Sequence, residues 1–164
     1  MYQRIVVPLD GSEFAERALP EAEGLARLTG APVHLLRVTD LSQFIWLGEF
    51  GIAMDVSDAE AETARETTDA AAYLLTIAER LAGSGLTAET EVRRGQTYRQ
   101  VIAATRPGDI IVMASHGRGG VPRWFLGSVA EEVLRHATVP ILMVRSGELA
   151  AAKSGATPLM AAVS

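Results

Sequence analysis

The chain contains no cysteine among its 164 residues, and this absence removes several classes of protein at once. Without thiols there is no disulfide scaffold, no thiolate zinc or iron–sulfur centre and no cysteine nucleophile. Such links are not needed, because a domain of about 150 residues buries roughly 68–70% of its unfolded surface. We therefore expect a single globular domain stabilised by its own apolar core.

Long apolar runs and an excess of positive charge are also missing. No stretch approaches the ~18 apolar residues of a membrane-spanning helix, and the N-terminus turns polar after a short apolar run. The 15 basic residues are outnumbered by 20 acidic ones, whereas a nucleic-acid binder needs a clustered basic face. These features predict a soluble, cytoplasmic protein that binds neither membranes nor nucleic acids.

Short apolar runs alternate with helical patterns along the chain. The runs predict strands over residues 4–9, 31–38, 86–92, 110–114 and 139–144. Apolar residues spaced three and four apart predict helices over 12–30, 59–81, near 98–102 and over 128–136. This order is typical of an α/β fold, a five-stranded parallel sheet with helices on both faces. The third strand is the most polar and is expected at a sheet edge.

Two loops that follow predicted strands contain the residues that could bind a ligand. In parallel sheets ligands bind beyond the carboxyl ends of strands, where neighbouring connections leave toward opposite faces. After the first strand, Asp10 or Ser12 can act as a helix N-cap, and the Asp10 carboxylate can equally contact a ligand. After the fourth strand, the glycine-rich segment 117–120 and then Gly127-Ser128 at a helix start suit an anion site made from backbone amides.

Ser128 has a second interpretation. Its spacing from Glu131 matches a capping box, in which each side chain accepts a hydrogen bond from the other residue's backbone amide. A closed box would not exclude ligand contact by the amides of Gly127 and Ser128. Both roles therefore stay open for this serine.

The two loops resemble those of the universal stress protein family. The first strand ends in a Pro-x-Asp-Gly-Ser-like turn, here Pro8 to Ser12. The second segment is similar to the family's nucleotide motif G-x2-G-x9-G-[ST]: Ala114-Ser115-His116-Gly117, nine residues, then Gly127-Ser128. Alanine stands where the pattern has its first glycine. The resemblance covers residues 1–145 as one domain, and the Ala-, Ser- and Gly-rich stretch 146–164 is expected to be a C-terminal tail.

The resemblance implies strand order 3-2-1-4-5 and a site for ATP with Mg²⁺. By position, the adenine and ribose would contact Pro8, Leu9, Asp10 and Val38, with Met113, Ala114, His116 and Gly117 alongside. The phosphates would contact Gly127, Ser128 and Val129. Ser12 and Arg118 complete the set of candidate ligand contacts, and no catalytic residue or protein metal site is assigned.

The function implied is a stress-response protein that binds ATP as a regulatory ligand. Hydrolysis is expected to be slow at most, because no clear general base or Walker lysine is present. The unprotected last strand and the resemblance together predict a symmetric homodimer through that strand. The alternative is a dimeric interaction module of the same fold that has lost nucleotide binding, with Ala114 as its mark.

Two further classes of protein are disfavoured by the same loops. An adenylating enzyme of the related adenine-binding superfamily should have a Ser-Gly-Gly-type loop after the first strand, where this chain has Asp10-Gly11-Ser12. A phosphoacceptor receiver domain should end its third strand in the acceptor aspartate, where this chain has Arg93-Arg94.

Overall fold

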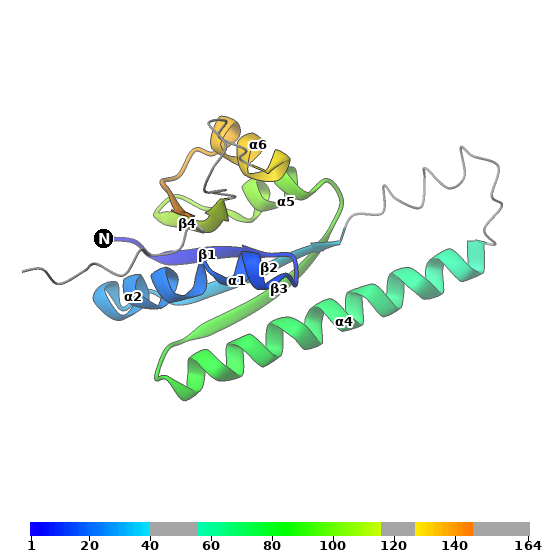
Figure 1. Cartoon of the computed structure of the whole chain (residues 1–164), viewed down its shortest axis with the longest axis horizontal. Helices are drawn as coiled ribbons and strands as arrows, with labels where there is room; N and C mark the ends of the chain where they lie inside the picture. Colours follow the sequence, from blue (N-terminus) through cyan, green and yellow to red (C-terminus); the bar gives the residue numbers. More distant parts are fainter. Residues whose placement is uncertain (40–55, 116–126, 146–164) are drawn as a thin grey trace, which may run out of the picture.

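A computed structural model describes residues 1–39, 56–115 and 127–145, without the side chains of 56–60. The strands are β1 (Arg4–Leu9), β2 (Val33–Thr39), β3 (Ala88–Arg94), β4 (Asp109–Ser115) and β5 (Ile141–Arg145). The helices are α1 (Glu13–Glu16), α2 (Leu19–Thr29), α4 (Val56–Gly83), α5 (Thr97–Ala104) and α6 (Ser128–His136). The strands form one parallel five-stranded sheet in the order β3-β2-β1-β4-β5 (Figure 1). The expected α/β fold, the strand order and the edge position of β3 are confirmed.

β1 shows how each central strand contributes to two cores. Ile5 and Val7 pack on one face of the sheet and Val6 packs on the other, because successive side chains of a strand point to opposite faces. The first face is covered by α2 and α4, with α1 beside them, and the second by α5 and α6 (Figure 1). Both faces of β1 are therefore buried, which explains its continuous run of apolar residues.

The helix expected over 12–30 is in fact two helices, so that prediction was wrong. α1 ends with Arg17 as its C-cap, and α2 begins at Leu19. Pro20 lies in the first turn of α2, where its missing N–H is tolerated. Inside one continuous helix the same proline would remove a hydrogen bond and clash with the preceding turn. The other elements differ from their predicted bounds by only a few residues at the ends.

A buried ion pair joins β1 to β4 at the amino end of the sheet. The Arg4 guanidinium donates to both carboxylate oxygens of Asp109, with Nη2–Oδ2 at 2.7 Å and Nε–Oδ1 at 3.3 Å. Arg4 Nη2 also donates to the Ala104 carbonyl at 2.7 Å, and the Arg106 amide donates to Asp109 Oδ2 at 2.8 Å. Both carboxylate oxygens of Asp109 and two of the three guanidinium nitrogens of Arg4 therefore have partners within the protein.

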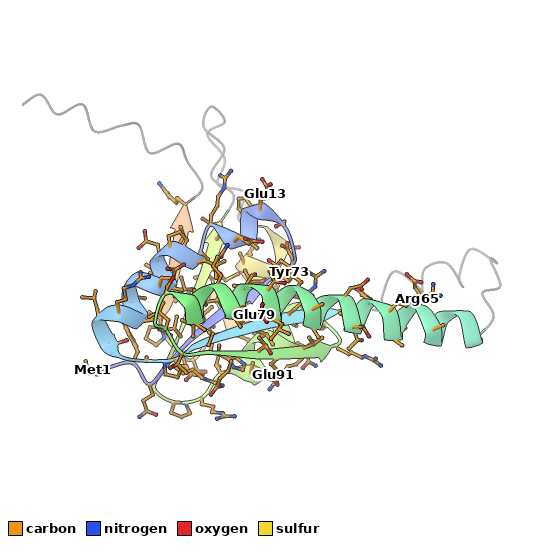
Figure 2. All side chains as sticks on the ribbon, turned by 90° about the horizontal axis from the view of Figure 1, so that it is seen from below. Met1, Glu13, Arg65, Tyr73, Glu79 and Glu91 are labelled. Atoms are coloured by element: carbon orange, nitrogen blue, oxygen red, sulfur yellow. The ribbon has the colours of Figure 1, made fainter. Side chains whose placement is uncertain are left out.

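α4 is the longest helix, with 28 residues, and it packs across β2 and β3 through its carboxyl-terminal half. Leu74, Ile77 and Leu81 of that half are buried in the first core. Figure 2 shows the amino-terminal half, which includes the exposed Arg65, extending past the end of the sheet. No helix in the described part of the chain is long and apolar enough to cross a membrane.

Candidate functional site

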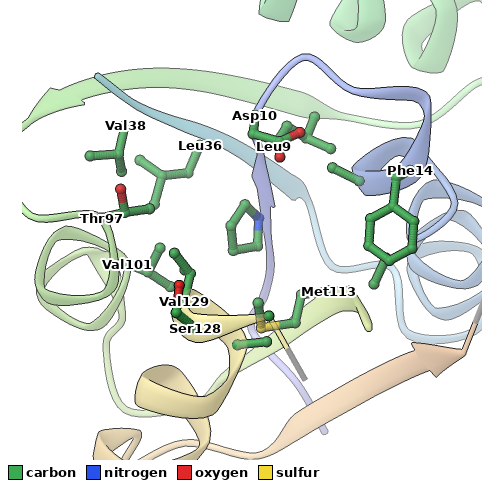
Figure 3. A pocket seen from close by; sticks show the side chains of 15 residues that line it. Leu9, Asp10, Phe14, Leu36, Val38, Thr97, Val101, Met113, Ser128 and Val129 are labelled. Atoms are coloured by element: carbon green, nitrogen blue, oxygen red, sulfur yellow. The ribbon is translucent and has the colours of Figure 1, made fainter. Parts of the chain in front are cut away.

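A cavity of about 280 Å³ lies at the carboxyl ends of β1 and β4 (Figure 3). These strands are neighbours in the sheet, but α1 follows β1 on one face and α6 follows β4 on the other. Such a change of side opens a crevice where parallel α/β folds bind ligands. The predicted site residues that line the cavity are Pro8, Leu9, Asp10, Val38, Met113, Ala114, Gly127, Ser128 and Val129.

The remaining predicted residues have different outcomes. Ser12 does not line the cavity; it is the N-cap of α1 and donates hydrogen bonds to Asp10. His116, Gly117 and Arg118 lie outside the described residues.

Sequence reasoning missed six lining residues: Phe14, Ala15, Leu36, Thr97, Val101 and Ala130. Leu36 was within reach, because it precedes Val38 by two positions and so shares its face of the strand. Thr97 was also within reach, since it begins the helix that follows the carboxyl end of β3. Phe14 gave no such signal, because its position depends on how the short helix α1 folds back beside β1.

The floor of the cavity is apolar. Leu36 from β2, Val101 from α5 and Met113 from β4 are buried beneath it. Figure 3 shows Phe14 on the opposite side of the cavity from Thr97 and Val101. An apolar floor with a few polar groups at the rim is the usual design of a site for a small organic molecule.

Asp10 lies at the rim, directly after β1, and its side chain is exposed. Its Oδ1 accepts hydrogen bonds from the Ser12 amide at 2.9 Å and the Ser12 hydroxyl at 2.6 Å. Ser12 in turn caps α1, because its Oγ accepts from the Ala15 amide at 3.1 Å. Of the two predicted capping candidates, Ser12 therefore has that role. Asp10 Oδ2 has no hydrogen-bond partner among the described residues.

The turn after Asp10 contacts side chains on the face of the sheet opposite the cavity floor. Gly11 has a φ of 84°, and a Cβ there would collide with Nη1 of Arg37. The Arg37 guanidinium lies 5.3 Å from the ring centre of Tyr73 on α4, and the Tyr73 hydroxyl donates to Glu16 Oε1 at 3.0 Å. Burial, together with Glu16, raises the pKa of Tyr73, so the phenol stays a donor. The positive φ at this position favours glycine, and a side chain there would also displace the Arg37 guanidinium.

The amino end of α6 borders the cavity without a side-chain cap. Gly127 is the N-cap residue and Ser128 is the first helical residue. The capping box considered for Ser128 is therefore not formed; the Glu131 carboxylate instead pairs with Arg135 at 3.1 Å. The first helical hydrogen bond runs from the Glu131 amide to the Gly127 carbonyl at 3.0 Å. The three amides before it have no acceptor within the helix and point toward its amino end, as in anion sites at helix ends.

Ala114, the departure from the glycine motif, lies in regular β4 and pairs with Val144. No residue other than glycine has a positive φ in the described part of the chain. The alanine therefore causes no backbone strain, and its methyl group is accommodated in the wall of the cavity.

Asp10 is the one carboxylate among the described residues that line the cavity. Nowhere in residues 1–39, 61–115 and 127–145 do three or more His, Asp or Glu side chains gather in a way that could hold a metal ion. The described residues that line the cavity thus offer a cation the Asp10 carboxylate as their one charged ligand.

A family model described as the universal stress protein family matches residues 1–145. The chain belongs to this family. Universal stress protein MJ0531 of Methanocaldococcus jannaschii is 31% identical over 147 residues, which cover 88% of this chain and 83% of that protein. Universal stress protein MJ0577 of the same organism is 30% identical over 155 residues, covering 88% of this chain and 96% of that protein.

A solved structure of the hypothetical protein MJ0577 has the same fold. It matches with a TM-score of 0.71 at 28% identity and covers 90% of this chain and 98% of that chain. The cavity of the present universal stress protein thus lies in the part of the chain that it shares with its relatives.

Proposed function

We propose that this universal stress protein binds an adenine nucleotide in the cavity between β1 and β4 and uses it as a regulatory ligand. The expected form is ATP with Mg²⁺, acting in a cytoplasmic stress response. One observation carries the proposal: an apolar floor, the Asp10 carboxylate and the uncapped amino end of α6 border the same cavity. These groups match the base, sugar and phosphates of a nucleotide in kind.

Each part of the cavity has one suitable role. The apolar floor of Leu36, Val38 and Met113 would hold the adenine ring, which gains from leaving water. Asp10 would accept hydrogen bonds from a ribose hydroxyl, since its carboxylate would repel a phosphate. The Ser128 hydroxyl and the first amides of α6 would hold phosphate oxygens. Mg²⁺, when bound, would neutralise phosphate charge through oxygen ligands.

Other members of the family bind nucleotides of this class. One universal stress protein, 20% identical to this chain, has been solved in complex with cAMP. Another, from Archaeoglobus fulgidus and 21% identical, has been solved with dAMP. At these identities the likeness covers the fold alone, so the support for nucleotide binding here comes from the cavity's own residues.

Binding rather than turnover is the proposed activity. No lysine, arginine or histidine is found among the described residues that line the cavity. A general base or a positioned cation is what hydrolysis of a phosphoanhydride requires. We therefore propose that hydrolysis by the described residues is slow at most.

We also propose a homodimer through β5, with residues 1–145 as the domain and 146–164 as an appendage. β5 pairs only with β4 among the described strands, so its other edge is open to a second copy. The alternative function, an interaction module without nucleotide, rested on Ala114. It loses its backbone argument because Ala114 needs no positive φ.

Calorimetric titration of the nucleotide-stripped protein with AMP, ADP and ATP, each with and without Mg²⁺, tests the proposal. We expect saturable binding near one nucleotide per chain. Asp10→Ala should weaken binding roughly ten- to a hundredfold, the worth of a hydrogen bond to a charged group. The matched control is Glu79→Ala, which removes an exposed carboxylate on α4. Equal affinity in both variants, or no binding of any nucleotide, would contradict the proposal.

A further inference from the structure

A second cavity, of about 420 Å³, opens beside the first between the amino ends of α5 and α6. Its lining residues are Gln96, Thr97, Tyr98, Ser128, Val129 and Glu132, which we call the outer groove. Thr97, Ser128 and Val129 line both cavities. A molecule bound in the inner cavity can therefore continue into the outer groove past these shared residues.

The two cavities differ in chemistry. The inner one is lined mainly by apolar side chains. In the outer groove every described lining residue except Val129 has a polar side chain: an amide, two hydroxyls, a phenol and a carboxylate. No lysine or arginine is among them. The outer groove is thus rich in hydrogen-bonding groups and carries negative charge at Glu132.

The walls of the outer groove are held in place by contacts within and between α5 and α6. The Glu132 carboxylate lies 3.4 Å from His136 Nδ1, a nitrogen that is also 2.9 Å from the Glu132 carbonyl. The His136 ring lies against the Tyr98 ring, with centroids 5.5 Å apart. Arg99, which does not line the groove, donates from Nε to the Tyr98 hydroxyl at 3.1 Å. A ligand would therefore meet side chains that are already positioned.

Charge decides which ligand suits this arrangement. Phosphates held at the amino end of α6 would lie beside Ser128, and Glu132 follows one helical turn later on the same side of α6. A terminal phosphate extended toward Glu132 would meet a like charge. Sugar hydroxyls, in contrast, donate to a carboxylate and accept from amide, hydroxyl and phenol groups.

We propose that the outer groove binds a sugar that is linked through phosphate to an adenine nucleotide. The ligand class is an adenosine diphosphate sugar, with adenosine in the inner cavity, the diphosphate at Ser128 and the second sugar against Glu132 and Tyr98. This inference rests on the proposed function, because it needs the adenosine to occupy the inner cavity.

Calorimetry with the full chain and three probes, AMP, ADP and ADP-ribose, tests the outer groove. We expect ADP-ribose to bind roughly tenfold more tightly than ADP, since the added sugar gains a hydrogen bond to a charged group. Glu132→Gln should abolish this advantage without weakening ADP binding, because it removes a like charge near the phosphates. Glu131→Gln, which alters an exposed neighbour paired with Arg135, should preserve it. Tyr98→Phe, which keeps the ring against His136, should reduce the advantage in part.

The outcomes separate the two proposals. If ADP binds but ADP-ribose binds no more tightly, the groove inference is wrong and the nucleotide site stands. If Glu132→Gln and Glu131→Gln behave alike, the sugar does not contact Glu132 and the inference is likewise wrong. If AMP, ADP and ATP all fail to bind, both proposals fall.

Discussion

The two ends of the sheet treat their charged groups in opposite ways. At the amino end, Arg4 and Asp109 are buried and bonded to each other and to the backbone. At the carboxyl end, Asp10 is exposed and one of its oxygens has no partner among the described residues, and the N-cap residue of α6 makes no side-chain cap. The same two strands, β1 and β4, connect these ends. A buried charge makes the stability of the fold depend on its partner. A charged or polar group without a partner among the described residues is available to a ligand.

The largest effect on stability is expected from breaking the buried ion pair at the amino end of the sheet. Asp109→Ala leaves the Arg4 guanidinium buried without its partner, which should lower the free energy of unfolding by about 3–5 kcal/mol. Urea denaturation measures the loss, and nucleotide affinity of the folded fraction should not change. The double variant Arg4→Met/Asp109→Leu, which removes both charges, should recover much of the stability. A loss below ~1 kcal/mol in the single variant would remove the contrast between the two ends.

Gly11→Ala should affect both stability and binding. The added methyl group meets Arg37 at a positive φ, so we expect the free energy of unfolding to fall by about 1–3 kcal/mol. Nucleotide affinity should fall as well, because the turn that presents Asp10 must shift. Gly24→Ala is the control: it lies in α2 with nothing near its would-be Cβ and should stabilise by roughly 0.5–1 kcal/mol. Unchanged melting of the Gly11 variant would show that neither the positive φ nor the contact with Arg37 costs the fold stability.

Ser128→Pro tests whether the amino end of α6 binds the ligand without disrupting the helix itself. Proline is tolerated at the first helical position, and Gly127 before it already has an extended conformation with ψ 149°. The fold should therefore persist while one amide and one hydroxyl are lost. We expect nucleotide affinity to fall roughly tenfold, and by less in Ser128→Ala, which loses only the hydroxyl. Circular dichroism and calorimetry measure the two effects; full affinity in the proline variant would place the phosphate elsewhere.

The smallest effect on stability is expected from Glu91, in the middle of the polar edge strand β3. Burial alone would raise the pKa of Glu91, but hydrogen bonds from Arg93 and His34 outweigh it and lower that pKa. The folded chain thus keeps Glu91 ionised at lower pH than the unfolded chain does. Its stabilising contribution is present above the unfolded pKa and is lost as pH falls through the folded pKa.

Glu91→Gln should flatten the acid side of the stability profile slightly, as measured by urea unfolding at several pH values. Glu79→Gln, which alters an exposed carboxylate on α4, is the control. The nucleotide affinity of both variants should equal that of the parent protein, because neither residue lines the cavity. An equally steep acid limb in Glu91→Gln would show that the bonds to His34 and Arg93 do not act on folding.

Local pattern was enough to predict the sheet but not the details of its ends. β1 and β4 were recognisable as strands because both faces of them are buried, and polar β3 was recognisable as an edge. The break between α1 and α2 depends on Pro20, which the helical spacing of apolar residues concealed. The strand order came from the resemblance, because periodicity does not say which strands are neighbours.

Some residues of the candidate site could likewise be predicted from the sequence, and others could not. Asp10, Gly127 and Ser128 stand next to strand and helix ends in sequence, so their place at the cavity could be predicted. Arg37 and Tyr73 could not, because they meet only when α4 packs across β2. The capping box, one of the two interpretations left open for Ser128, is not formed, because Gly127 is the N-cap and Glu131 pairs with Arg135.

The most direct test of the contrast between the two ends is an amide NMR titration of the labelled protein with AMP. The account predicts that the largest shifts occur at Asp10, Val38, Ser128 and Val129, which border the inner cavity. The amides of Arg106 and Asp109, at the opposite end of the sheet, should not move. Shifts concentrated at the amino end, or no saturable shift at Ser128 and Val129, would contradict the assignment of the carboxyl end as the nucleotide site.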